Sequence, residues 1–268
     1  MRSMAEQFQK KLNRLQRELP EGLLVDAAWM ERHGYSSSLR SQYVSAGWLI
    51  SPAPRVYRRS RSSLTWLQVV ASLQDLLEYP LTVGGRTALE QQGYAHYLST
   101  TLQEVHLYGP KRPPTWLSAL PLEAKFHWHN SLPLFSEEEQ TALKPGRSRV
   151  VDPAGLAVAL PIHLSSKERA VLELLDELPN RESFSQVDAL MEGLTDLSPR
   201  RLQGLLEDCR SVKVKRLFLF FADRHRHAWR PKLDLTRIDL GAGKRSLVKG
   251  GRLDKHYNIT VPADLGEL

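Results

Sequence analysis

The chain has 268 residues, 41% hydrophobic and 25% charged, a composition ordinary for a globular protein with one large domain or two to three small ones. Its one cysteine, Cys209, excludes an intramolecular disulfide framework, and the sequence has neither a secretion signal nor a run of transmembrane length. The formal net charge of +7 is concentrated in residues 1–62, which hold 11 Lys and Arg against 5 Asp and Glu. We therefore expect a cytoplasmic protein, not bound to a membrane, whose N-terminal segment meets a polyanion.

Residues 5–19 predict an amphipathic helix, because Leu12, Leu15 and Leu19 fall on one side of it. After this helix, Leu23 to Val25 can form a short strand. Such a helix would lie beneath the elements that follow it and cover their apolar side.

Two short helices come next. Asp26 is a good N-cap for the first, because its carboxylate can accept from the free N–H groups of the opening turn, and Gly34 ends that helix. Ser36 caps the second helix and Gly47 closes it. The Gly-containing turn between them is typical of a helix-turn-helix.

A small basic hairpin follows the second helix. Residues 48–50 read as a strand, residues 51–54 as a tight turn, and residues 55–59 as the return strand. Two helices followed by such a hairpin predict a winged helix-turn-helix, with Arg55, Arg58 and Arg59 on the wing and Arg61 just beyond it.

The second helix separates two faces at about 100° per residue. Leu39, Tyr43 and Ala46 fall together and are expected to pack on the first helix. Ser37 and Ser41 lie opposite with Ser45, with Arg40 at their edge and Val44 on neither face. Small hydroxyls and one arginine suit phosphates and base edges in a major groove. The alternative is a solvated helix and charged hairpin on a domain that binds protein.

The middle of the chain predicts a helix from Thr65 and a strand at 81–83, then Gly84-Gly85 ahead of another helix. A double glycine at a helix start can cradle a phosphate, but this one lacks the Lys-Ser/Thr of a P-loop and the third glycine of a dinucleotide site. A close-packed turn is the better interpretation. Residues 104–108 and 125–129 read as strands.

Two patterns in or just before these strands have residue types that could bind a metal ion. His127 and His129 share a strand face, but no cysteine or carboxylate of recognisable spacing accompanies them, so we predict no metal site. Glu123 and Lys125 have the spacing of a metal-dependent nuclease strand, for which Glu104 is the nearest upstream carboxylate. A nuclease therefore remains an alternative, as does a regulator that senses a small molecule in the middle region.

From Ser165 the chain reads as helical, beginning with a capping-box pattern from Ser165 to Glu168. Further helices are expected at 184–191 and from Ser198, and the apolar run 212–223 reads as a buried strand. This order predicts a second winged-helix-like unit. Basic residues gather around it and in the Gly-rich tail: Lys213, Lys215, Arg216, Lys244, Arg245, Lys249 and Arg252. They suit an acidic protein surface or an RNA backbone, or form a solvated turn.

The expected fold class is α+β, in three parts. Residues 1–62 form the winged helix-turn-helix, residues 63–163 a mixed α/β middle domain, and residues 164–268 a mainly helical C-terminal domain. We expect no catalytic residue, no cofactor and no metal.

Four stretches together resemble the AbiEi antitoxins, which are transcription-regulator partners in bacterial abortive-infection toxin–antitoxin pairs. These are GWLISPAPRVYRR, VGGRTALEQQGYAHYL, SVKVKRLFL and LGAGKRSLVKGGRLDKHYNITVP, and with the intervening residues they span nearly the whole chain. The resemblance implies a winged helix that represses the protein's own operon. It also implies a C-terminal part that neutralises a cognate AbiEii toxin, a nucleotidyltransferase-like protein.

With the resemblance, the expected partners are double-stranded operator DNA and that toxin. The residues expected at DNA are Ser36, Ser37, Arg40, Ser41, Arg55, Tyr57, Arg58 and Arg59. The basic residues around and within the Gly-rich tail are the expected contacts of the toxin.

Overall fold

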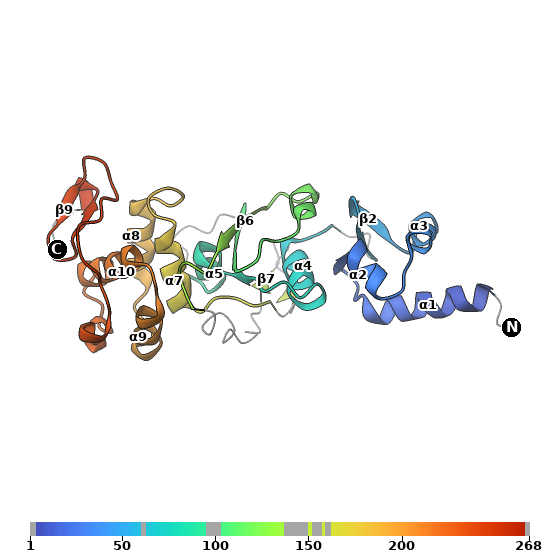
Figure 1. Ribbon diagram of the computed structural model, residues 1–268, viewed down its shortest axis with the longest axis horizontal. Helices are drawn as coiled ribbons and strands as arrows, with labels where there is room; N and C mark the ends of the chain where they lie inside the picture. Colours follow the sequence, from blue (N-terminus) through green and yellow to red (C-terminus); the bar gives the residue numbers. More distant parts are fainter. Residues whose placement is uncertain are drawn as a thin grey trace.

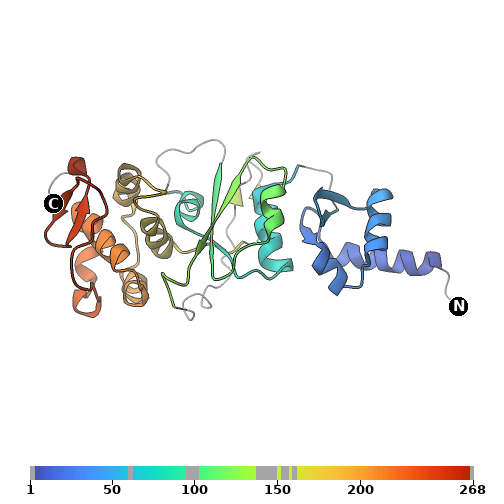
Figure 2. The ribbon, with the colours of Figure 1, turned by 45° about the horizontal axis from the view of Figure 1, so that its top comes forward.

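The computed structural model describes residues 4–59, 63–94, 103–136, 150–151, 157–158 and 162–265. Its elements follow one another along the long axis of the molecule, with the N-terminus at one end and the C-terminus at the other (Figure 1). The same sequence of units is visible after a turn about that axis (Figure 2). Helices alternate with small sheets, as expected for the α+β class.

The first unit packs three helices against a three-stranded antiparallel sheet. Its elements are α1 (Met4–Glu18), β1 (Leu24–Asp26), α2 (Ala27–Arg32), α3 (Ser37–Ser45), β2 (Ile50–Ala53) and β3 (Val56–Arg58). The strand order is β1-β3-β2, so the short strand before α2 joins the hairpin as expected. Leu12, Leu15 and Leu19 are buried beneath these elements.

The ends of α2 and α3 lie where their capping residues predicted. The side chain of Asp26 accepts from the Trp29 N–H at 2.8 Å, and the side chain of Ser36 accepts from the Leu39 N–H at 3.4 Å. Gly34 and Gly47 have φ of 83° and 74° and end the two helices with the paired carbonyl contacts of a Schellman motif. Ala46 differs from expectation: it lies beyond the last helical residue and is exposed.

The middle region holds a second small sheet between helices. Its elements are α4 (Trp66–Ala71), the π-helical η1 (Ser72–Leu76), β4 (Thr82–Val83), α5 (Gly85–Gln91), β5 (Glu104–Gly109), the 3-10 turn η2 (Thr115–Ala119) and β6 (Lys125–Asn130). The sheet order is β4-β5-β6, and β5 and β6 are parallel with His106 opposite His127. Strands β7 (Val150–Val151) and β8 (Ala157–Val158) pair separately. Residues 95–98 of the helix expected after Gly85, and Arg61, lie outside the described residues.

The C-terminal region is helical and then ends in a hairpin. Its elements are α7 (Lys167–Asp176), α8 (Phe184–Gly193), α9 (Pro199–Asp208), α10 (Val212–Arg224), the 3-10 turns η3 (Arg230–Lys232) and η4 (Leu235–Arg237), β9 (Arg252–Asp254), β10 (Ile259–Val261) and η5 (Ala263–Leu265). The expected buried strand at 212–223 is wrong, because that segment is α10. The two-stranded β9–β10 comes later instead of directly after α9.

The physical reason is that α10 is buried around most of its circumference. Residues 214–222 are all buried, so no polar face marks the helical period, and an apolar run cannot be assigned to helix or strand by periodicity. From Val212 to Lys215, apolar and charged residues alternate, a pattern that is typical of a strand. The decisive local signal is Ser211, whose side chain accepts from the Val214 N–H at 3.3 Å as an N-cap.

The expected capping box of α7 is also corrected. Ser166, not Ser165, is the N-cap and accepts from the Arg169 N–H at 3.3 Å. Ser165 instead donates from its hydroxyl to Glu173 Oε1 at 3.0 Å. Glu168 is buried and accepts from the N–H of Ser198, the N-cap of α9, at 2.9 Å, so it contacts the start of a different helix.

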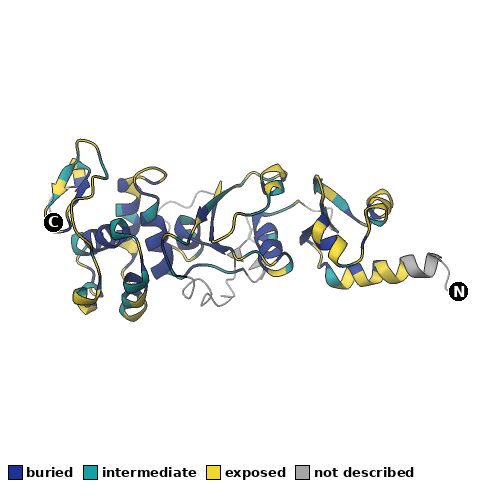
Figure 3. Ribbon diagram, in the orientation of Figure 1, coloured by how far each residue is buried: buried dark blue, intermediate teal, exposed yellow. Residues whose placement is uncertain are grey.

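Two clusters of buried apolar side chains stabilise the molecule. One joins the first unit to α4 and to the inner residues of β4 and β5, and the other joins α5 to α7–α10 and the terminal hairpin. Buried residues concentrate in the helices of the second cluster, while α3 and residues 9–18 of α1 are largely exposed (Figure 3). Cys209 is buried as expected, and burial raises the pKa of its thiol to about 11. Across the described residues, every helix is too short or too polar to cross a bilayer.

Candidate nucleic-acid interface

The outward face of α3 is made of small polar side chains. Ser37, Ser38, Ser41, Gln42 and Ser45 are all exposed, whereas Tyr43 is buried and Leu39 is half-buried against the unit. Among the described residues, the side chains of Ser37, Ser41, Gln42 and Ser45 have no hydrogen-bond partner, while the Ser38 hydroxyl lies 3.1 Å from that of the N-cap Ser36. The helix therefore offers donors and acceptors that are not used within the fold.

Arg40 does not lie at the edge of this face, which corrects the expectation. Its side chain is 5% exposed, because the guanidinium turns inward to the link between α2 and α3. There Nη1 donates to the Tyr35 carbonyl at 2.9 Å and to the Ala27 carbonyl at 3.5 Å, and Nη2 donates to Glu31 at 2.9 Å. Arg40 holds the two helices together and is not available to a phosphate in this structure.

The hairpin also uses most of its arginines internally. Arg58 is 2% exposed, and Arg59 donates to the carbonyls of Gln16 and Leu19 at 2.8 and 3.0 Å, at the end of α1. Arg55 alone of these three is exposed, at the turn between the strands and with a φ of 65°. The expectation that Arg58 and Arg59 reach DNA is therefore not supported by their positions. Tyr57 is half-buried, with Arg40 5.8 Å from its ring.

Sequence reasoning missed Ser38 and Gln42 as members of this surface. With Ser41 and Ser45 they follow the spacing i, i+3, i+4, i+7, which marks one helical face and could have found them. Trp48, expected at the start of a strand, precedes β2 and has 46% of its surface exposed. Arg32, at the end of α2, is exposed as well.

The basic residues expected at a toxin fall into two groups. Lys213 donates to the carbonyls of Asp176 and Leu178, and Lys215 is buried. Arg216 donates to three carbonyls of the Gly-rich tail, among them Leu240 at 2.8 Å and Gly243 at 2.6 Å, and to the Asn258 carbonyl at 3.3 Å. Lys213 and Arg216 therefore make contacts within the fold, and Lys215 is buried, so their positions do not favour them as partner contacts. The exposed members of the set are Lys244, Arg245 and Lys249, and Arg252 is half-buried.

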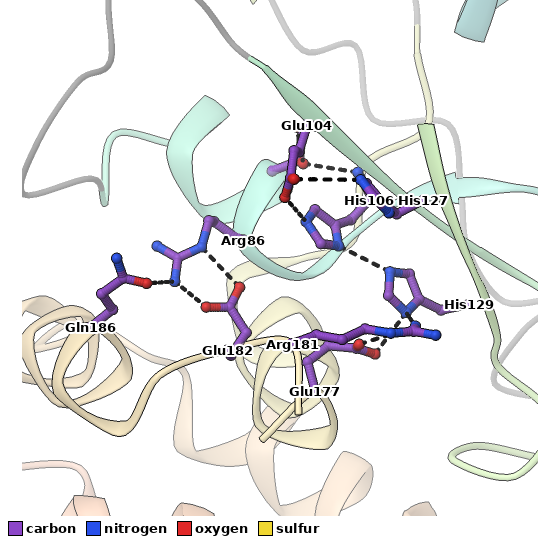
Figure 4. Close-up of polar contacts among 10 residues, drawn as sticks. Arg86, Glu104, His106, His127, His129, Glu177, Arg181, Glu182 and Gln186 are labelled. Carbon is purple, nitrogen blue, oxygen red and sulfur yellow. Dashed lines mark hydrogen bonds and ion pairs between the residues drawn. The ribbon is translucent and has the colours of Figure 1, made fainter. Parts of the chain in front are cut away.

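A second polar cluster lies between the middle sheet and the C-terminal helices (Figure 4). His106 Nδ1 lies 2.9 Å from His129 Nε2, and His129 Nδ1 lies 2.6 Å from Glu177 Oε1. On the open side, Glu104 is 3.9 Å from His106 and 3.6 Å from His127. Beside this row of side chains, Arg86 of α5 makes a bidentate contact with the carboxylate of Glu182. The described contacts of these imidazoles are carboxylates, rings and Arg181, so the cluster joins the sheet to the helices.

Burial, and next the neighbouring His129, lowers the pKa of His106 to about 4 from the ordinary 6.5. Burial alone would raise the pKa of Glu177, but the hydrogen bond and charge of His129 lower it. As pH falls below 6.5, His106 becomes protonated in the unfolded chain, whereas in the folded chain it stays neutral until about pH 4. The free energy of unfolding should therefore decrease by up to about 3 kcal/mol as the pH falls from 6.5 to about 4. The lowered pKa of Glu177 adds a further decrease at lower pH.

We expect His106→Gln to flatten this pH dependence, measured as the free energy of unfolding in urea between pH 7 and pH 4. His256→Gln is the matched control, because His256 is exposed on the terminal hairpin and should leave the slope unchanged. Part of the slope should survive in His106→Gln, since burial also lowers the pKa of His227. If the free energy of unfolding varies with pH equally in the parent and in His106→Gln, the pH dependence does not come from His106.

The double glycine at the start of α5 is a close-packed turn, as predicted. The Gly85 N–H donates to Glu173 Oε2 at 3.0 Å, so a carboxylate of the protein occupies the place where a phosphate would bind. A Cβ on Gly84 would lie 2.2 Å from that oxygen and 2.5 Å from a ring carbon of Tyr108. Only glycine fits this approach.

The structure does not bring the His127–His129 pattern or the Glu123–Lys125 pattern together with further ligands among the described residues. No group of three or more His, Cys, Asp and Glu side chains among the described residues is placed to hold a metal ion. His129 is turned inward to Glu177, and His127 faces Glu104. Glu123 and Lys125 are exposed at the start of β6.

Comparison with known proteins agrees with the resemblance seen in the sequence. A family model described as the N-terminal domain of the transcriptional regulator AbiEi antitoxin matches residues 8–100. A second, described as "Transcriptional regulator, AbiEi antitoxin, Type IV TA system", matches residues 102–262. The search of curated proteins gave no match.

Among solved structures, the chain is similar in fold to the crystal structure of the RV2827C protein from Mycobacterium tuberculosis. The TM-score is 0.55 at 15% sequence identity, over 97% of this chain and 92% of that chain. At this identity the likeness concerns the fold alone. The two family models together cover nearly all of the sequence, so the chain belongs to the AbiEi family, the antitoxin transcriptional regulators of type IV toxin–antitoxin systems.

Proposed function

We propose that this protein represses its own toxin–antitoxin operon by binding operator DNA through its N-terminal unit, and that its C-terminal region neutralises a cognate nucleotidyltransferase-like toxin. It performs no catalysis itself. The observation that carries the proposal is the outward face of α3, where the side chains of Ser37, Ser41, Gln42 and Ser45 have no hydrogen-bond partner among the described residues. Helix α3 follows α2 through a tight turn and precedes the β2–β3 hairpin, which is the order of a winged helix-turn-helix.

Exposed cations surround this face and supply the phosphate contacts. Arg55 projects from the tip of the hairpin, and Arg32 lies at the end of α2. The N-terminal helix adds Lys10 and Arg17, both exposed. In this arrangement Arg55 serves as the wing contact that Arg58 and Arg59 do not provide, and α3 lies in the major groove.

The antitoxin activity belongs to the C-terminal region, where the exposed Lys244, Arg245 and Lys249 form the surface for an acidic patch of the toxin. These residues lie on the Gly-rich segment that Arg216 holds by its carbonyls. That segment is also tied to β10, because the Thr260 N–H donates to the Arg245 carbonyl at 3.0 Å. Removing the tail would therefore damage the fold, and point substitutions are the better test.

The test of DNA binding uses the full-length chain and a labelled duplex from upstream of its own gene. We expect binding at about 50 mM salt that weakens steeply as salt rises. Arg55→Glu should weaken binding and reduce the magnitude of the salt slope by about 1, because one phosphate contact is lost. Arg200→Glu, an exposed arginine on α9, is the matched control and should bind as the parent does. A parent chain that ignores the duplex at low salt would overturn the proposal.

Neutralisation is tested separately by co-expressing the protein with its toxin, the product of the nucleotidyltransferase-like reading frame that we expect beside its gene. Arg55→Glu should still rescue growth, because the wing takes no part in restraining the toxin. The triple change Lys244→Glu, Arg245→Glu and Lys249→Glu should lose rescue while keeping DNA binding. Rescue by the triple variant would exclude this basic surface as the toxin contact.

A further inference from the structure

The chemistry of the α3 surface limits which bases it can read. Every residue of α3 is described, and the exposed side chains are five polar ones and a valine: Ser37, Ser38, Ser41, Gln42, Val44 and Ser45. Specific contact with guanine in the major groove ordinarily needs Arg or Lys on its O6 and N7 atoms. The only basic residue of α3 is Arg40, and its guanidinium is held by Tyr35, Ala27 and Glu31.

Gln42 is the one exposed side chain of α3 that can make a two-point contact with a base. A carboxamide carries a donor and an acceptor on the same planar group, which matches N7 and the N6 amino group of adenine. The neighbouring serines are short, so the backbone of α3 can approach the floor of the groove and Gln42 reaches furthest from it. The amide has no hydrogen-bond partner among the described residues, so it is available to a base.

We propose that Gln42 is a specificity-determining residue of this protein and reads an adenine of its operator in the major groove. Nε2–H donates to N7 of the adenine, and Oε1 accepts from its N6 amino group. The serines on either side contact phosphates or less specific base edges, and Arg55 fixes the register on the backbone. The inference rests on the proposed function, since it concerns the same surface.

The first experiment selects duplexes from a random library with the full-length protein. The parent should enrich adenine at one position per bound copy, and Gln42→Ala should lose the preference at that position alone, with affinity for the adenine site reduced by roughly 5- to 150-fold. Gln42→Arg should move the preference to guanine. Gln16→Ala, on the exposed side of α1, is the matched control and should keep the parental profile.

The second experiment tests the atoms. Replacing the selected adenine by 7-deazaadenine removes the N7 acceptor, so the parent should lose affinity and Gln42→Ala should be indifferent to the change. If Gln42→Ala keeps the parental base profile, or the parent tolerates the deaza base, the inference is wrong while the proposed function stands. If the parent binds no duplex even in dilute salt, both are overturned together, and the two failures are thereby distinguished.

Discussion

Replacing Arg40 with glutamate should unfold the first unit rather than remove a DNA contact, lowering its free energy of unfolding by about 3–5 kcal/mol. The buried guanidinium donates to the Tyr35 carbonyl and to Glu31, and it links the turn to both helices. A glutamate here would place a second carboxylate beside Glu31 and leave the Tyr35 carbonyl without its donor. The cost of an unpaired buried charge is what makes this effect large.

Hydrogen exchange of the backbone amides in α2 and α3 measures the stability of these two helices directly. The matched control is Arg55→Glu, the same change at an exposed site of the same unit, which should leave exchange unaltered and weaken DNA binding only. Arg40→Met should fall between the parent and Arg40→Glu, since it introduces no charge. Parental exchange rates in Arg40→Glu would show that the guanidinium does not hold the helices together.

The backbone of the first unit could be predicted because its signals are local. Asp26, Ser36, Gly34 and Gly47 each act on atoms within a few residues, and the structure confirms all four. The candidate site was predicted less well. Helical spacing fixes where a Cβ points, but a long side chain can fold back, and Arg40 reaches carbonyls on the core side instead of the groove side.

The same limit explains the wing. Alternation along a strand does not reveal that the end of α1 lies beside Arg59, whose acceptor Gln16 is 43 residues away in sequence. Of the residues on this surface, Gln42 and Arg55 remain exposed. That property depends on tertiary packing and is not encoded in a local pattern.

Helix α7 shows this contrast most clearly. Its glutamates could be read as a solvated acidic face, yet Glu168, Glu173 and Glu177 are all buried. Glu168 accepts from the Ser198 N–H at the start of α9, Glu173 from the Gly85 N–H at the start of α5, and Glu177 contacts His129 of β6. Each carboxylate thus ties α7 to a different element, so this helix positions the middle sheet relative to the C-terminal helices.

Glu173 should be the most sensitive of these three positions, and we expect Glu173→Ala to reduce the free energy of unfolding by about 3–5 kcal/mol. The carboxylate is fully buried and satisfies three donors: the Gly85 N–H, the Ser165 hydroxyl and Arg169 Nε at 2.8 Å. Removing it leaves the buried guanidinium of Arg169 without this carboxylate and opens the turn at Gly85. Urea unfolding of the full chain measures the loss, and Glu192→Ala on the exposed side of α8 is the matched control.

A double substitution separates lost charge pairing from lost packing. If the cost of Glu173→Leu comes mainly from taking this carboxylate away from Arg169, adding Arg169→Met should restore part of the stability, because two apolar side chains can replace a buried ion pair at little cost. The part that is not restored then measures the cap on α5, since no apolar side chain can accept from the Gly85 N–H. Full additivity of the two substitutions would instead mean that Glu173 acts on α5 and Ser165 alone, and that the 2.8 Å contact with Arg169 contributes no net stability.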